Sequence, residues 1–305
     1  MSRMTIQLFG LMGVAIGVVA AEPQYRWRAA DDCLALISGE QVLWQLNFRI
    51  GEGKPFFHPL TTKDGTVLTA ARPEDHPWHF GLWWSWKYIN DLNYWEEERR
   101  TGRSPGVTEV VSVQPLAKAD HSARVAMDLS YHPSGKPAIL KEKRVLWITA
   151  PDARGNYSIV WDSTFTACAE ALKFDRTPPA KGAGGYAGLG LRFSAGTRGW
   201  TFAGSEGKVG AKDIYGTQGA WVDFQRGHGV AVLDHPQNPR HPTLWYPNEK
   251  HPFLCAAFLF KEPYELAAGK TLRLRYLVLV HSEPLSKDAL QQKWLSFSRT
   301  TPNDS

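Results

Sequence analysis

The segment from Pro73 to Arg100 carries the densest set of chemically active side chains in the sequence. It interleaves histidines, asparagines and carboxylates with tryptophan and tyrosine, whereas a core strand needs only alternating apolar residues. Broad aromatic faces beside hydrogen-bonding groups are typical of a site for a flat, polyhydroxylated ligand. We therefore predict a carbohydrate site. The alternative interpretation is a tryptophan-rich edge of the core whose charges lie in water.

Two histidines of this segment, His76 and His79, are candidate acid–base catalysts. Pro77 lies between them and disfavours a helix, so both imidazoles are expected on a turn or an extended stretch. A neutral imidazole exchanges a proton near physiological pH, which suits general acid–base catalysis. Together with His58 the pair equally suits a transition-metal site. A metal ion at His58, His76 and His79 is therefore the alternative to a site without a cofactor.

The carboxylates that follow Trp95 complete the predicted catalytic set. A carboxylate directly after an indole can be desolvated, and desolvation raises its pKa toward useful acidity. We predict Glu96 or Glu97 as the acid–base partner of a histidine, whereas Glu98 and the arginines after it are expected in solvent. The residues predicted to contact a sugar in this part of the chain are His58, Arg72, Trp78, Trp83, Trp84, Asn90, Asn93 and Trp95.

A second polar segment, Asp234–Trp245, follows an apolar strand and contains three prolines. A rigid loop so rich in donors and acceptors is more than a connection between strands requires. We predict that His241 takes part in catalysis and that both segments line one cleft, with Trp83 or Trp95 on its wall. Further predicted substrate contacts are His235, Asn238, Arg240 and Trp245, with Arg192 as a buried cation on a neighbouring strand.

Most of the chain has the pattern of short β-strands separated by turns, such as the Asp-Gly turn at Asp64. One helical pattern occurs near the end, where Ser286 can cap a helix that runs to Phe297. These features predict an all-β protein, a single large antiparallel β-sandwich over residues 22–305 with one C-terminal helix. The predicted strands are Cys33–Ser38, Val42–Phe48, Phe56–Leu60, Thr66–Thr69, Val107–Val113, Arg124–Tyr131, Leu140–Ile148, Tyr157–Ala167, Leu189–Phe193, Trp221–Phe224, Gly229–Leu233, Cys255–Phe260 and Thr271–His281.

The N-terminus has the pattern of a secretory signal peptide over residues 1–21: Arg3, an apolar stretch to Ala20, and a small residue at Ala21. The protein is therefore expected to be exported, either periplasmic or secreted. The apolar stretch is short and interrupted by glycine, and no other stretch approaches membrane length, so no membrane span is expected after cleavage.

The composition excludes some partners and leaves others open. A formal net charge of +5 and a pI near 9.0 are modestly basic, but the charges are scattered, so a nucleic-acid partner is not expected. The three cysteines lack metal or redox spacing, and we expect mostly buried, small apolar residues at Cys33, Cys168 and Cys255. The sequence does not determine the oligomeric state.

Five stretches resemble one known family, and the likeness runs from about Tyr25 to Trp294. They are PFFHPL, DHPWHFGLWWSWKYINDLNYWEE, GGYAGLGLRF, GVAVLDHPQNPRHPTLWY and LAAGKTLRLRYLVLVH. They are similar to the secreted "methane oxygenase PmoA-like" family, and this resemblance implies a galactose-mutarotase-like β-supersandwich. Sugar enzymes of that fold often use a histidine as acid and a carboxylate as base. The family has no established catalytic residues to transfer, and Phe80 stands where a polar residue is expected.

The leading functional hypothesis is an exported carbohydrate-active enzyme. It would be a glycoside hydrolase, a lyase or a sugar epimerase that uses histidine and glutamate for acid–base chemistry on a carbohydrate or glycoside. One alternative is a histidine-ligated, metal-dependent oxygenase or hydrolase. The other is a noncatalytic carbohydrate-binding module. The sequence does not identify the sugar or its linkage.

Overall fold

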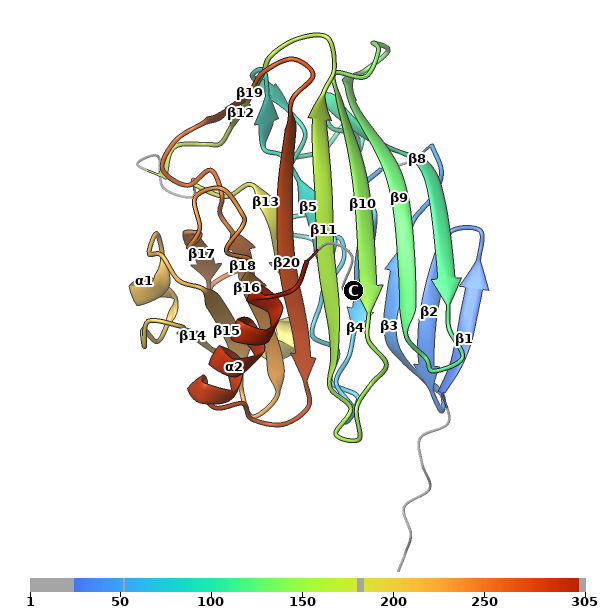
Figure 1. Cartoon of the computed structure of the whole chain (residues 1–305), viewed down its shortest axis with the longest axis vertical. Helices are drawn as coiled ribbons and strands as arrows, with labels where there is room; N and C mark the ends of the chain where they lie inside the picture. Colours follow the sequence, from blue (N-terminus) through green and yellow to red (C-terminus); the bar gives the residue numbers. More distant parts are fainter. Residues whose placement is uncertain (1–24, 52, 180–183, 302–305) are drawn as a thin grey trace, which may run out of the picture.

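The computed structural model describes residues 25–51, 53–179 and 184–301. The predicted signal peptide, residues 1–21, lies outside these ranges. The described residues form an antiparallel β-sandwich of two eight-stranded sheets, with a four-stranded sheet at one end (Figure 1). This architecture confirms the predicted all-β sandwich. No helix within the described ranges has the length and apolar character needed to cross a membrane.

The first sheet pairs an N-terminal meander with strands from the second half of the chain. Its order is β1 (Tyr25–Ala30), β2 (Cys33–Ser38), β3 (Gln41–Asn47), β4 (Phe56–Leu60), β5 (Leu82–Ser85), β13 (Gly188–Arg192), β18 (Phe253–Ala256) and β17 (Trp245–Asn248). Strands distant in sequence therefore become neighbours at β5, β13 and β18.

The second sheet contains the longest strands. Its order is β14 (Thr201–Gly204), β15 (Trp221–Gln225), β16 (Gly229–Asp234), β20 (Thr271–His281), β11 (Tyr157–Ala167), β10 (Leu140–Ile148), β9 (Ala123–Pro133) and β8 (Gly106–Ala117). The small sheet contains β19 (Tyr264–Leu266), β12 (Leu172–Asp175), β6 (Tyr88–Ile89) and β7 (Leu92–Asn93), and the helical segments are α1 (Ala211–Ile214), α2 (Lys287–Ser298) and a short 3-10 turn (Ala195–Thr197).

The main core lies between the two large sheets, and it includes Trp84 from the first sheet and Trp161 from the second. Successive side chains of a strand point to opposite faces, so Trp83 points away from this core. It joins Phe253 and other rings in a separate cluster on the outer face of the first sheet. On the outer face of the second sheet, α2 covers a third cluster (Figure 1). The two outer clusters are therefore on opposite sides of the molecule.

The predicted C-terminal helix is confirmed. In α2 the Ser286 side chain accepts a hydrogen bond from the Ala289 backbone N–H at 3.1 Å, as expected of an N-cap serine. The longest strands, β8 to β11 and β20, lie where the alternating pattern predicts them.

Two predicted strands are wrong in detail. Thr66–Thr69 makes only isolated bridges, from Val67 to Thr61 and from Thr69 to Phe193, each one residue beyond the ends of β4 and β13. The strand predicted at Cys255–Phe260 begins at Phe253 and ends at Ala256, where a turn closes with a hydrogen bond from Phe260 N to Ala257 O. Cys255 is buried as expected, whereas Cys33 and Cys168 are only half-buried.

Gly81 connects the predicted histidine segment to β5 in a conformation that favours glycine. Its φ is +74°, and a Cβ built there would lie 2.3 Å from the Phe57 carbonyl oxygen of β4. Gly135 has a similar φ of +69°, but a Cβ there would contact nothing within 4 Å. A comparison of alanine substitutions at Gly81 and Gly135 therefore distinguishes the cost of backbone strain from the cost of the steric clash.

We predict that Gly81→Ala lowers the free energy of unfolding by at least about 2 kcal/mol, because it adds a clash with β4 to the left-handed strain. Gly135→Ala carries the strain alone, on the order of 1 kcal/mol. Urea denaturation of both variants measures the difference. Equal losses for the two would show that the close approach to β4 is not maintained.

Candidate functional site

The residues from Arg72 to Phe80, here called the covering loop, lie over the outer face of the first sheet. The ends of the loop are joined by a 2.7 Å hydrogen bond from Arg72 N to His79 O and by a bridge between Ala71 and Phe80. Within it, His76 N donates to Pro73 O, and His79 N donates to His76 O. Pro77 therefore sits in a compact turn, as the sequence predicted.

On one side of the covering loop, three of its residues meet two residues from other segments in a polar group. We call this group the Asp75 cluster: Asp75, His76, His79, Arg192 and His251. Arg192, on β13, places Nη2 2.8 Å from Asp75 Oδ1 and 2.6 Å from Oδ2. His251, in the turn between β17 and β18, places Nδ1 2.6 Å from the same Oδ2. Three segments distant in sequence thus meet at one carboxylate.

The charge state of Asp75 is set by its partners. Burial alone would raise its pKa, but the hydrogen bond and positive charge of Arg192, with the hydrogen bond from His251 and the nearby His76 imidazole, hold it well below the ordinary value. Asp75 is consequently ionised at neutral pH, and it neutralises Arg192, which is nearly buried.

His79 lies in a stack of rings. Its ring centroid is 4.7 Å from that of His76, 5.1 Å from that of Phe253 and 5.0 Å from that of Trp83. Burial is the main cause that lowers its pKa far below the ordinary value, and the charges of His76 and Arg192 add to the effect. His79 is therefore neutral at physiological pH, and only 6% of it is exposed.

Glu96 differs from its prediction. It forms an ion pair with the buried Lys87, and it accepts a hydrogen bond from Asn93 Nδ2 at 2.6 Å. Burial would raise its pKa, but Lys87 and Asn93 outweigh burial and lower it. The expectation of a raised pKa at Glu96 is therefore wrong. Asn93 also accepts from the Trp95 backbone N–H, so its amide organises this turn.

A cavity of about 640 Å³ opens on the other side of the covering loop. Arg72 and Glu97 line it as a two-pronged ion pair, with Arg72 Nη2 2.6 Å from Glu97 Oε2 and Nη1 3.2 Å from Oε1. The Arg72 guanidinium lies 5.2 Å from the centre of the Phe80 ring, which packs at 5.3 Å against Phe56. Both rings belong to the cavity wall.

Lys54 is another of the charged residues that line this cavity. It donates to the Trp95 carbonyl oxygen at 2.8 Å. Burial lowers the pKa of Lys54 to about 8, although the carboxylates of Glu97 and Glu96 oppose the shift. A lysine with such a pKa in a cavity is a candidate proton donor.

The catalytic and polar side chains predicted in the second segment lie apart from those of the first, although Leu244 packs against the outer cluster of the first sheet. His241 places Nδ1 2.7 Å from Asp234 Oδ2 and stacks parallel to Trp294 of α2, with the ring planes 5° apart. This packing lies on the outer face of the second sheet, whereas His76 and His79 lie on that of the first. The prediction of one common cleft is therefore wrong.

The polar groups of that segment are used within the fold. Asn238 donates to Asp234 and accepts from the Arg275 backbone N–H, both at 2.7 Å. Arg240 donates to the carbonyl oxygens of Phe258, Glu262 and Pro263. His235 is fully buried against Arg275, and burial lowers its pKa to about 4. These contacts explain the density of donors and acceptors without a ligand.

Several predicted ligand contacts have structural positions. Trp84 and Trp245 are packed in the core between the sheets, so neither offers a ring face to a sugar. Trp83 and Trp95 are fully buried in the outer cluster, and Trp78 is half-buried against it. Asn90 occupies the β6–β7 turn with φ +49° and accepts from the Lys173 backbone N–H. His58 lies 3.0 Å from Thr69 Oγ1.

Sequence reasoning missed Lys54 and His251. Lys54 has no neighbouring pattern that indicates a site. His251 is followed by Pro252, but the same His–Pro dipeptide occurs at five other positions: His58, His76, His132, His235 and His241. The dipeptide therefore does not single out His251.

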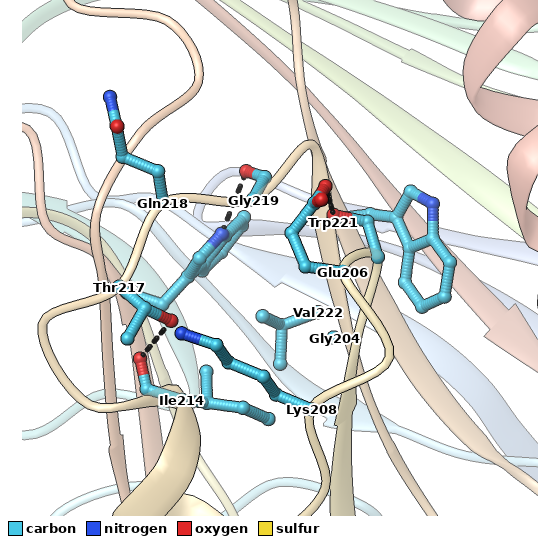
Figure 2. Close-up of a pocket in the computed structure, with 11 residues that line it drawn as sticks. Gly204, Glu206, Lys208, Ile214, Thr217, Gln218, Gly219, Trp221 and Val222 are labelled. Atoms are coloured by element: carbon cyan, nitrogen blue, oxygen red, sulfur yellow. Dashed lines mark hydrogen bonds between the residues drawn. The ribbon is translucent and has the colours of Figure 1, made fainter.

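A much smaller cavity of about 10 Å³ lies between β14, β15 and β17, with Ile214 and Trp221 in its lining (Figure 2). Figure 2 shows the Thr217 hydroxyl donating to the Ile214 carbonyl oxygen at its edge. A cavity of this volume has room for about one water molecule, so it is too small for a sugar or a cofactor.

Residues 33–295 match a family model described as a family of unknown function (DUF6807). The chain belongs to this family. The DUF6807 region includes the covering loop, Lys54 and His251, so the whole candidate site lies within it. No curated protein matches the chain. Among solved structures, the Slr1438 protein from Synechocystis sp. PCC 6803 is similar, with 10% identity, coverage of 88% of this chain and 100% of that chain, and a TM-score of 0.39.

The Lys87–Glu96 pair gives a test of the site's packing. We predict that Lys87→Met lowers the free energy of unfolding by about 3 kcal/mol, because it leaves a half-buried carboxylate without its cation. The double variant Lys87→Met/Glu96→Gln is expected to recover most of this loss. Thermal and urea unfolding measure both.

The control is Lys173→Met, which breaks the pair with Asp175 at 3.1 Å on the surface and is expected to cost much less. A loss at Lys87 no larger than that at Lys173 would contradict a structural role for the Lys87–Glu96 pair.

Proposed function

We propose that this protein is an exported carbohydrate-active enzyme that cleaves a glycosidic bond or epimerises a sugar by acid–base catalysis. The observation that carries the proposal is the cavity beside the covering loop, where the rings of Phe56 and Phe80 stand next to Lys54, Arg72 and Glu97. Its volume is within the range of small-ligand sites. Aromatic faces with a few charged hydrogen-bonding groups suit a sugar ring.

The proposed base is Glu97 and the proposed acid is Lys54. Arg72 holds the Glu97 carboxylate at the cavity wall in a fixed orientation. Lys54, with its pKa lowered to about 8, can release a proton to a leaving oxygen near neutral pH. The proposed roles thus move from His79 and Glu96, which are enclosed by rings and by Lys87, to residues that line the cavity.

Two further predictions belong to this proposal. One is export directed by a signal peptide at residues 1–21. The other is membership of the PmoA-like proteins, with a galactose-mutarotase-like supersandwich, for which the resemblance of the sequence is the support. The antiparallel sandwich is compatible with that finer fold.

A noncatalytic carbohydrate-binding module is the second candidate, because the same cavity could bind a sugar without turning it over. Lys54 distinguishes the two candidates. A binding module needs only a hydrogen-bond donor at that position, whereas an enzyme needs a group that loses its proton near neutral pH.

We predict that Glu97→Gln lowers kcat on a responsive glycoside by about 100-fold or more while changing sugar affinity by only a few-fold, because the amide keeps the shape but cannot accept the proton. A panel of glycosides, followed by sugar release and by chromatography for epimers, identifies the substrate. Isothermal titration then measures binding for both proteins.

Glu98→Gln is the matched control, because Glu98 is the next residue and its side chain is exposed. It should leave kcat unchanged. Sugar binding by the wild type without turnover of any glycoside would favour the binding module. Turnover retained in Glu97→Gln would reject Glu97 as the base.

The pH dependence tests Lys54 separately. As an acid it must be protonated, so kcat/KM is expected to fall as the pH rises through about 8. Lys54→Arg keeps a positive charge that is not released in this range, so it should bind sugar and lose turnover. An unchanged alkaline limb in a Lys54 variant that is still active would show that another group titrates.

A further inference from the structure

We propose that Asp75, His76 and His251 bind a divalent transition-metal ion at the outer face of the first sheet. Among the residues that the structure describes, these three bring one donor atom each to within 4.8 Å of one another. Asp75 Oδ2 is 2.6 Å from His251 Nδ1 and 3.2 Å from His76 Nδ1. The carboxylate oxygen therefore stands between the two imidazoles.

The donor set comes from two rigid parts of the fold. Asp75 and His76 belong to the covering loop, and His251 belongs to the turn that enters β18, 176 residues from Asp75. That turn is fixed by a hydrogen bond from His251 N to Asn248 Oδ1. Since the ligands are held before any ion arrives, little ordering is required on binding.

Arg192 supplies the partner that a ligating carboxylate usually has. It bonds to both oxygens of Asp75, which fixes the plane of the carboxylate and leaves Oδ2 facing the imidazoles. Nδ1 of His76 is buried and has no hydrogen-bond partner, although it lies 3.2 Å from Asp75 Oδ2. No hydrogen bond of the fold uses this nitrogen, so it can serve as a metal ligand.

The type of ion follows from the ligands. Two imidazoles and one carboxylate suit Zn²⁺ or Fe²⁺, whereas Mg²⁺ and Ca²⁺ prefer oxygen alone. Between 32% and 37% of each of the three side chains is exposed, so solvent or a ligand can fill the remaining coordination positions. This set replaces the predicted alternative of His58, His76 and His79, because His58 lies against Thr69 and His79 is enclosed by rings.

The proposal is independent of the sugar chemistry, so its test measures metal binding and needs no substrate. Untagged protein that lacks only the predicted signal peptide, residues 1–21, is treated with a chelator and dialysed. It is then titrated with Zn²⁺, Mn²⁺ and Mg²⁺ by calorimetry. We expect one equivalent of Zn²⁺ per chain, weaker binding of Mn²⁺ and none of Mg²⁺ under the same conditions. Elemental analysis of protein isolated from the native compartment gives the resident ion.

His251→Ala and Asp75→Asn are each expected to weaken Zn²⁺ binding by at least about tenfold. The matched control is His132→Ala, because His132 also lies beside a carboxylate, with its Nε2 3.3 Å from Glu109 Oε2. Among the described residues, no third metal-ligating side chain joins that pair. This control should leave the affinity unchanged. Thermal unfolding without metal shows whether each variant is folded.

Absence of stoichiometric Zn²⁺ or Mn²⁺ binding by the wild type would overturn the assignment, and the cluster would then be an ion-paired hydrogen-bond network. Equal affinity in the wild type and His251→Ala would overturn it as well, because it would place the ion elsewhere. Metal binding without any turnover of glycosides would leave this assignment in place and remove only the proposed function.

Discussion

The organisation of the candidate site depends on one constraint: β5, β13 and β18 are buried on both faces. Their inner face packs in the core between the sheets, and their outer face carries Trp83 and Phe253. Large aromatic rings left in water would forfeit about 25 cal/mol for each Å² of apolar surface. The chain therefore lays the covering loop and the residues around Trp95 over this face. The polar groups of the site lie at the edges of these covering segments.

The same burial decides which charges can be used by a ligand. Arg192 projects from β13 toward the covered face and is neutralised by Asp75, and Lys87 is neutralised by Glu96. A buried charge without a partner costs several kcal/mol, so these pairs are required by the fold. The groups that retain access are at the edges of the cover, in the large cavity and at the exposed side of the Asp75 cluster.

The sequence predicted the long strands and the capped helix. These features are local, since they depend on alternation, a serine cap and residue types close together in the chain. It failed for His251 and Lys54, whose relevance arises only when strands distant in sequence become neighbours in the first sheet. The spacing of residues in the sequence does not indicate which distant strands pair in the sheet.

The segment that contains His241 shows a different failure. Its prolines, amides and imidazoles look like a binding loop, but it crosses from β16 of one sheet to β17 of the other. A segment that leaves a sheet needs hydrogen-bond partners for its own backbone groups and for those that it buries. Asn238 and Arg240 provide such partners, because they donate to the carbonyl oxygens of Arg275 and Glu262. Residue types alone do not distinguish polar groups that serve the fold from those that serve a ligand.

The covering loop also has a consequence for communication within the molecule. Arg72 on the cavity side and Asp75 on the opposite side are three residues apart, and the hydrogen bond from Arg72 N to His79 O closes the loop. Arg72 has a φ of +51°, so it has little room to relax locally. An occupant that displaced either residue would therefore strain the same short, hydrogen-bonded loop. By thermodynamic linkage, any coupling free energy between an occupant of the cavity and one at the Asp75 cluster would be the same in both directions.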